Sequence, residues 1–175
     1  MRILRGKYAG RHLTSPGKSV RPTAEEVRDR WVGLLEDELK GARVIDLFAG
    51  SGAVGLEALS RGARSADFVE NGAAALHSLK ANVARLRTGT KCRVFKKDVI
   101  PFVERLDAGA YDLAFADPPY GSRKLDRVVE RWLEVPFAPV LAIEHAKDHT
   151  VPARGKSYDL GGPTRITILP ARPSS

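Results

Sequence analysis

Residues 44–55 read VIDLFAGSGAVG, an apolar run that ends in three closely spaced glycines. This pattern predicts a buried strand that turns directly into a helix, because glycine permits a tight turn and lets a ligand approach the backbone. Gly50, Gly52 and Gly55 satisfy the G-x-G-x-x-G spacing of dinucleotide sites, and Glu70 ends the next apolar run, where it can bind ribose hydroxyls. Taken alone, the pattern suits NAD as well as other nucleotides, and it also occurs as a turn that binds no ligand.

From residue 43 onward, short apolar runs alternate with segments of helical periodicity. Regular alternation predicts a Rossmann-like, doubly wound α/β fold, with a mostly parallel sheet covered on both faces. The expected strands are 43–48, 66–70, 92–96, 111–116 and 139–144, and the expected helices are 53–61, 72–86, 99–106 and 123–134. The tail departs from this rhythm, because the strand-like runs 156–160 and 165–169 are separated by Gly-Gly-Pro. They predict a closing antiparallel pair.

The first 22 residues carry only positive charge. Weak alternation around Gly6 and Gly10 predicts a short basic hairpin or an extended arm. The whole chain has a net charge of +8, which favours a polyanionic partner through counterion release. We therefore expect a nucleic-acid contact surface, although solvated charges that only keep the protein soluble are the alternative. The six cations of this segment are Arg2, Arg5, Lys7, Arg11, Lys18 and Arg21.

A capping box opens the helix that we expect at residues 24–40. Thr23 is followed three residues later by Glu26, and apolar side chains then recur at helical spacing. Trp31 lies on this apolar stripe, so we expect it in the core and not as a platform on which a base stacks.

The composition of the 175 residues excludes several classes of protein. The chain has no apolar run of the length that a membrane span needs and no signal-peptide pattern at its start, so we expect a cytoplasmic protein. Cys92 is the only cysteine, which excludes a disulfide framework and a multi-cysteine zinc site, and we expect it to be buried. The four histidines show no metal-ligand spacing, and no metal is expected. His145 either lines a pocket, lies on the surface, or contacts the residues that line a pocket.

A second motif, Asp117-Pro118-Pro119-Tyr120, follows the expected strand 111–116. Two prolines make a stiff loop, which holds the Asp117 carboxylate and the Pro118 carbonyl as preorganised acceptors. An exocyclic amine of a nucleic-acid base offers two N–H donors beside a flat ring, which two acceptors and one aromatic side chain match. A rigid turn at the end of a strand is the structural alternative.

Together these motifs resemble the class I methyltransferases that act on base amines. Arg-Pro-Thr at 21–23, DLFAGSGAVGLEALSRGA at 46–63 and DPPY at 117–120 resemble the bacterial 16S ribosomal RNA guanine-N2 methyltransferase family. The resemblance implies transfer of a methyl group from S-adenosylmethionine to N2 of a guanine, of the guanine-966 type, in 16S rRNA or the small ribosomal subunit. We expect a monomer, although the sequence leaves the oligomeric state open. Leu160 to Thr164 stand where the family has an aromatic-Gly-Asp-Thr element, so the role of this segment stays open.

The resemblance also implies roles for individual residues. Residues 1–22 are expected to form a hairpin or arm that contacts RNA, and residues 23–175 are expected to form the methyltransferase domain. Asp117 and Pro118 are expected to accept hydrogens from the amine, Pro119 to stiffen the loop and Tyr120 to stack on the base. The residues expected to contact RNA phosphates are Arg123, Lys124 and the six cations of the N-terminal segment. The residues expected around the cofactor are Thr23, Asp46, Phe48, Ala49, Gly50, Ser51, Gly52, Glu70, Asn71, Asp98 and Val99.

Two of these assignments have alternatives, and so does the function as a whole. Asp98 either accepts from the adenine amine or caps the helix that follows it, and the two roles are compatible. Thr23 is both a helix cap and a candidate for the lid of the cofactor pocket. The other functions that the sequence leaves open are a DNA adenine-N6 methyltransferase, an NAD(P)-dependent oxidoreductase and a non-catalytic RNA-binding assembly factor.

Overall fold

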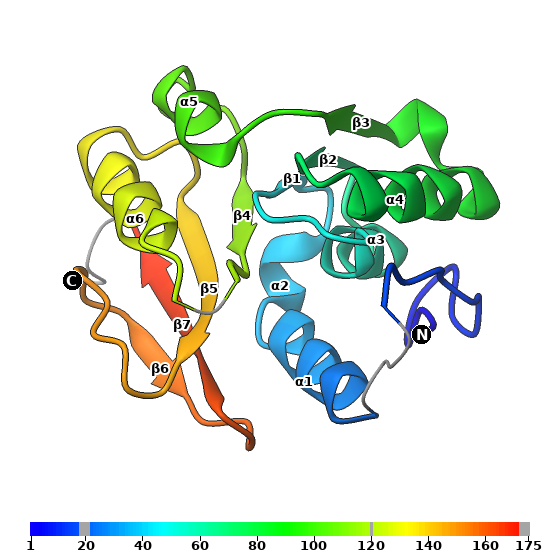
Figure 1. Ribbon diagram of the computed structural model, residues 1–175, viewed down its shortest axis with the longest axis horizontal. Helices are drawn as coiled ribbons and strands as arrows, with labels where there is room; N and C mark the ends of the chain where they lie inside the picture. The colour runs from blue at the N-terminus through cyan, green and yellow to red at the C-terminus, as the bar shows by residue number, and fades with distance from the viewer. Residues whose placement is uncertain (18–21, 120, 172–175) are drawn as a thin grey trace.

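A seven-stranded sheet with helices on both faces forms the molecule (Figure 1). The computed structural model describes residues 1–17, 22–119 and 121–171, and of residues 22–24 it describes the backbone alone. The strands are β1 (Arg43–Asp46), β2 (Ser65–Val69), β3 (Cys92–Phe95), β4 (Leu113–Ala116), β5 (Val140–Ala146), β6 (Lys156–Tyr158) and β7 (Thr164–Pro170). The helices are α1 (Pro22–Gly33), α2 (Glu36–Leu39), α3 (Ala53–Ser60), α4 (Ala73–Leu86), α5 (Val99–Glu104) and α6 (Lys124–Glu134), with the 3₁₀ turn η1 (Gly89–Lys91).

The strand order is β3-β2-β1-β4-β5-β7-β6. Strands β1 to β5 pair in parallel, whereas β7 is antiparallel to both β5 and β6. The predicted mostly parallel sheet with a closing antiparallel pair is therefore confirmed. Each strand expected from the sequence is present, as is each helix expected after residue 43, with ends that differ by no more than two residues.

The buried central strands divide the core into layers. In β4, all four residues are buried, and they alternate between the two faces of the sheet. Ala114 and Ala116 pack with residues of α5 and α6, whereas Leu113 and Phe115 pack with residues of α1 and α2. Helices therefore cover both faces of β4, and the polar residue Asp117 follows at its carboxyl end.

The single helix expected at residues 24–40 is wrong, because the chain forms two helices there. Helix α1 ends at Gly33, and α2 begins at Glu36. Glycine disfavours the interior of a helix, which favours an end at Gly33. After it, the Leu35 N–H bonds to the Val32 carbonyl at 3.1 Å, and this i to i−3 bond belongs to a tighter turn than that of an α-helix. The expectation for Trp31 is confirmed: it is buried and packs edge-to-face on Phe115, with ring centroids 5.4 Å apart.

The N-terminal residues form a hairpin that is anchored in the core. Arg2 and His12 make an antiparallel bridge, and the Ile3 N–H bonds to the Arg11 carbonyl at 2.9 Å. Ile3 and Leu13 are buried in a cluster with residues of α3 and α4. Cys92, expected to be buried, is half-buried at the rim of the same cluster.

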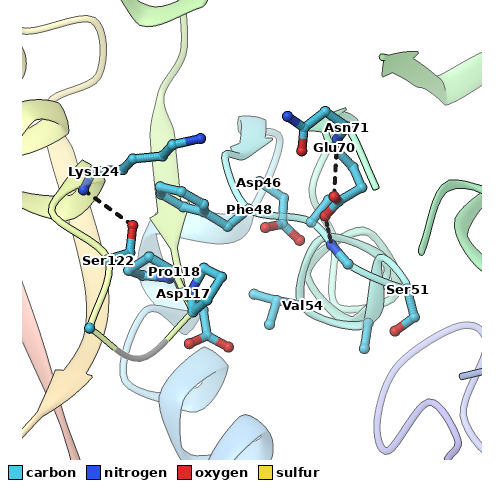
Figure 2. A pocket seen from close by; sticks show the side chains of 15 residues that line it. Asp46, Phe48, Ser51, Val54, Glu70, Asn71, Asp117, Pro118, Ser122 and Lys124 are labelled. Carbon is cyan, nitrogen blue, oxygen red and sulfur yellow. Dashed lines mark hydrogen bonds between the residues drawn. The ribbon is translucent and has the colours of Figure 1, made fainter. Parts of the chain in front are cut away.

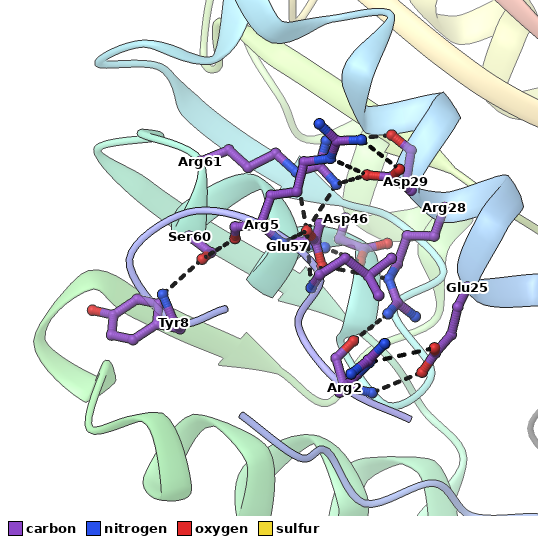
Figure 3. A network of polar contacts seen from close by, with 12 residues as sticks. Arg2, Arg5, Tyr8, Glu25, Arg28, Asp29, Asp46, Glu57, Ser60 and Arg61 are labelled. Atoms are coloured by element: carbon purple, nitrogen blue, oxygen red, sulfur yellow. Dashed lines mark hydrogen bonds and ion pairs between the residues drawn. The ribbon is translucent and has the colours of Figure 1, made fainter. Parts of the chain in front are cut away.

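A buried ion network ties this hairpin to α1 and α3 (Figure 3). At its centre lies Glu57 of α3, which is fully buried. Its carboxylate accepts the backbone N–H groups of Leu4 and Arg5, each at 3.0 Å, and pairs with Arg61 at 2.8 Å and Arg28 at 3.6 Å. Of the two forms that the sequence left open, a hairpin or an extended arm, the structure has the hairpin, and it packs against α1 and α3. Within the described ranges, no helix has both the length and the apolar character that crossing a bilayer requires.

Candidate active site

A cavity of about 740 Å³ opens at the carboxyl ends of β1, β2 and β4 (Figure 2). Its volume lies within the range of small-molecule sites, and its position is where the strand order reverses between β1 and β4, the usual ligand site of such sheets. The lining residues are Asp46, Phe48, Ala49, Gly50, Ser51, Ala53, Val54, Glu70, Asn71, Asp117, Pro118, Pro119, Gly121, Ser122 and Lys124. The cavity thus brings together the glycine turn and the Asp-Pro-Pro loop, which the sequence separates by more than 60 residues.

The glycine turn has a backbone that other residues adopt rarely. Gly50 and Gly52 have φ angles of +55° and +83°. A Cβ at Gly52 would lie 2.4 Å from the Cδ1 of Leu79, so packing as well as conformation requires glycine there. At Gly50 a Cβ would meet no described atom within 4 Å, so this backbone borders open space.

Glu70 holds the glycine turn in place. Its Oε2 accepts the Gly50 N–H at 2.8 Å, and its Oε1 accepts the Asn71 N–H at 3.0 Å and the Gly72 N–H at 2.8 Å. Glu70 therefore links the turn after β1 to the turn that begins α4, and it lies on the cavity wall as the sequence predicted.

Asp46 lies at the end of β1, where it is almost fully buried at the base of the cavity. Its Oδ2 accepts the Gly55 N–H at 3.1 Å. Burial raises the pKa of Asp46 to about 7, the negative charge of Glu70 adds to this, and the bond from Gly55 opposes it. Asp46 therefore braces the first turn of α3 from the base of the cavity.

Asp117 follows β4 and faces the cavity. Solvent in the open cavity reaches its side chain, yet the surrounding protein removes enough water that the pKa of Asp117 lies well above its usual value. The carboxylates of Glu144 and Asp46 raise it further. Glu144 of β5 was not predicted as a site residue, although it stands near the carboxyl end of the strand beside Asp117. Burial also raises the pKa of Glu144, and a hydrogen bond from Thr164 opposes this.

Asp98 is the N-cap of α5, so the capping interpretation is confirmed. Its Oδ1 accepts the Ile100 N–H at 3.0 Å, and its Oδ2 pairs with the Lys124 Nζ at 2.6 Å, which lowers the pKa of Asp98. Asp98 lines a neighbouring depression of about 370 Å³ with Phe102, and Val99 is buried beneath it in α5. Lys124, expected to hold phosphate, is thus engaged with a carboxylate at the rim of the main cavity.

A smaller cavity of about 170 Å³ lies behind the Pro118-Pro119 loop, where Arg123 and His145 line it. The Nε2 of His145 in β5 lies 2.7 Å from the hydroxyl of Thr167 in β7. His145 therefore connects these two strands and also lines the smaller cavity. The part of the chain that the structure describes holds no group of three or more His, Cys, Asp and Glu side chains arranged to hold a metal ion.

The basic hairpin is less free than its sequence suggested. The Arg5 guanidinium makes two bonds to Asp29 of α1, at 2.7 and 2.9 Å. The Arg2 backbone N–H donates to Glu25 at 3.0 Å, and the Arg2 Nε lies 3.9 Å from the same carboxylate. The acidic partners come from α1, which local charge counting does not reveal. Lys7 and Arg11 are exposed. Three predicted residues, Lys18, Arg21 and Tyr120, lie outside the described residues, as does the side chain of Thr23.

Comparisons with known proteins give consistent results. The family model described as conserved hypothetical protein 95 matches residues 1–160. The chain is 35% identical over 130 residues to ribosomal RNA small subunit methyltransferase D of Escherichia coli K12, a match that covers 74% of this chain and 65%, less than two thirds, of that relative. A solved Escherichia coli structure described as a methyltransferase has a TM-score of 0.83 at 30% identity, and 97% of both chains is covered.

A more distant structure supports the fold alone. The SAM-dependent methyltransferase of Agrobacterium tumefaciens has a TM-score of 0.62 at 18% identity, covering 87% of this chain and 63% of that chain. The family match includes the glycine turn, Glu70 and the Asp-Pro-Pro loop. The chain therefore has the class I methyltransferase fold and belongs to the conserved hypothetical protein 95 family, the family of ribosomal RNA small subunit methyltransferase D.

Proposed function

We propose that this protein transfers a methyl group from S-adenosylmethionine to the exocyclic N2 of a guanine in 16S ribosomal RNA, of the guanine-966 type. The observation that carries the proposal is the single cavity in which the glycine turn faces the Asp-Pro-Pro loop (Figure 2). A relative with 35% identity is named for methylation of small-subunit ribosomal RNA, which supports the substrate class.

The residues present fit the cofactor. Open space beside Gly50 leaves room for a ligand against the backbone, and the Glu70 carboxylate at the cavity wall suits a pair of ribose hydroxyls. Phe48 and Ser51 border the part of the cavity that we assign to the methionine portion, and Asp98 in the adjoining depression suits the adenine amine. When bound, this cofactor supplies a methyl group on a cationic sulfur, which is the electrophile that an amine requires.

Asp117 and Pro118 then act on the amine. The Asp117 carboxylate and the Pro118 carbonyl accept its two hydrogens, which orients the nitrogen lone pair and favours a tetrahedral nitrogen. Asp117 takes the proton that the amine loses on methylation. Because its surroundings raise the pKa of Asp117, it accepts a proton more readily at neutral pH than an ordinary aspartate does. A paired base hides its amine, so the target must be unpaired or flipped out of its stack.

The test is transfer of labelled methyl from S-adenosylmethionine to unmethylated small ribosomal subunits, with the product nucleoside identified by mass spectrometry. N2-methylguanosine is the expected product, and the same assay on free 16S rRNA and on DNA defines the substrate. Transfer to adenine in DNA would overturn the proposal in favour of a DNA methyltransferase. Cofactor binding without transfer to any nucleic acid would instead support a non-catalytic assembly factor.

Replacing Glu70 by alanine is expected to weaken S-adenosylmethionine binding by about 10–100-fold, because charge-assisted hydrogen bonds to the cofactor are lost and the Gly50 N–H loses its acceptor. Titration calorimetry on the free protein measures the change. The exposed Glu38 of α2 provides the control, and Glu38→Ala should bind the cofactor as the unmodified protein does. Equal affinities for Glu70→Ala and Glu38→Ala would remove Glu70 from the cofactor site.

Replacing Lys7 and Arg11 together by alanine is expected to weaken RNA binding and to reduce its salt dependence. Each lost phosphate contact lowers the slope of log affinity against log salt by about 0.7–0.9. Filter binding across a salt series measures this slope. The control is the pair Lys40 and Arg64, two exposed cations in the turns that precede β1 and β2. A slope that changes equally in both double variants would mean that the hairpin makes no special contact.

A further inference from the structure

We infer that Glu144 recognises the ring N1–H of the target base, and so selects guanine among the bases that carry an exocyclic amine. This inference rests on the proposed function and names the residue that chooses its substrate. It depends on where β5 places Glu144, on the hydrogen bond that fixes this side chain, and on the donor pattern of guanine.

The strand register places Glu144 beside Asp117. Strands β4 and β5 are parallel, and Ala116 pairs with Ile143, so Asp117 and Glu144 are the next residues along neighbouring strands. Paired residues on adjacent strands, about 4.8 Å apart, point to the same face of a sheet. Two residues earlier on each strand, Phe115 and Ala142 lie in one core cluster, which identifies this face. The carboxylate of Glu144 therefore neighbours the one that lines the main cavity.

Thr164 holds the Glu144 side chain in one orientation. Its hydroxyl donates to the Glu144 Oε1 at 2.9 Å from the first residue of β7, the antiparallel neighbour of β5. Thr164 is buried and belongs to the segment whose role the sequence left open. With Oε1 fixed, the direction of the second oxygen is set as well, so Thr164 acts as a positioning residue for Glu144.

Burial and, in addition, the negative charge of Glu144 raise the pKa of Asp117, so the two adjacent carboxylates repel each other. A ligand with two adjacent N–H donors relieves this repulsion. Guanine has that arrangement, since its N1–H stands next to its N2 amine. The amines of adenine and cytosine stand next to an unprotonated ring nitrogen, whose lone pair would face the Glu144 oxygen. A buried acceptor left without its donor disfavours such bases strongly.

The experiment compares two target bases in small subunits reconstituted with ligated 16S rRNA. One carries guanosine, and the other carries 2-aminopurine, which keeps the amine at C2 but has an acceptor at N1. The unmodified enzyme is expected to favour guanosine in kcat/KM by about 10²–10⁴-fold. In Glu144→Gln, the amide can donate to the N1 acceptor, so this preference should fall by about tenfold or more. Without cofactor, the ratio of the two dissociation constants should fall in the same way.

Two further variants test the position of Glu144. Thr164→Val should reduce the base preference, and Thr164→Ser, which keeps the hydroxyl, should restore it. Thermal melts and cofactor titration establish that each variant is folded and binds S-adenosylmethionine. A Glu144→Gln enzyme that methylates guanosine with the original preference would overturn this inference and leave the proposed function intact. Failure of the unmodified enzyme to methylate guanosine would overturn both.

Discussion

Replacing Asp117 by alanine is expected to lower the rate of methyl transfer by about 10²–10⁴-fold while S-adenosylmethionine binding stays nearly unchanged. The carboxylate lines the cavity from the loop after β4, opposite the glycine turn. Its removal takes away both an oriented acceptor for the amine and the group that receives its proton, without altering the turn that we assign to the cofactor. Single-turnover methyl transfer and calorimetric titration measure the two quantities separately.

The exposed Asp148, in the loop after β5, provides the matched control, and Asp148→Ala should retain full activity. The pH profile gives a second check. An aspartate can take the proton from the amine only when it is ionised, above its pKa. Because burial and the charges of Glu144 and Asp46 raise the pKa of Asp117, activity should fall with decreasing pH in a range above that of an ordinary aspartate. Undiminished turnover in Asp117→Ala would refute the catalytic assignment.

Replacing Glu57 by alanine is expected to lower the free energy of unfolding by about 3–5 kcal/mol, the largest loss of stability that we predict. The substitution leaves the buried guanidinium of Arg28 without its carboxylate partner, and it leaves that of Arg61 paired with Asp29 alone. It also leaves the N–H groups of Leu4 and Arg5 without an acceptor. Urea denaturation followed by circular dichroism measures the change.

A matched control lies on α6, where Glu130 is exposed. Glu130→Ala should change the free energy of unfolding by no more than about 0.5 kcal/mol. If the two variants were equally stable, the network in Figure 3 would contribute nothing to stability. The same contacts mean that deleting residues 1–13 should destabilise the domain, so point substitutions on the hairpin surface are the better test of RNA binding.

Apolar periodicity was sufficient to predict the sheet, because each strand of the parallel part is a short buried run bounded by turn residues. It failed at residues 34 and 35, where the chain bends so that Leu35 and Leu39 both reach the core beneath Trp31. That bend depends on the surface of the sheet, which lies far away in the sequence. The role of Glu57 was also missed, although one signal was present: it is the only charged residue of α3.

The glycine and proline residues of the site motifs were predicted better than the ion pairs that its charged residues make. Glycine and proline restrict the backbone locally, so Gly50 and Pro118 could be placed on the cavity wall from the sequence, whereas Gly52 is buried behind the wall. The pairing of Asp98 with Lys124 and of Arg5 with Asp29 depends on contacts between distant elements. Glu144 stands beside Asp117 only because β5 lies next to β4, a neighbour relation that alternation alone does not specify.

The central position of β1 has a consequence for synthesis of the chain. Strand β1 is made first, and β2 and β3 extend the sheet on one side of it, yet its partner on the other side is β4, which begins at Leu113. While the ribosome translates the intervening residues, the half-sheet has an open, apolar edge on β1, a strand that is interior in the complete sheet. Such an edge is prone to association with other chains. We therefore expect the nascent protein to depend on chaperones most during the interval between completion of β3 and emergence of β4.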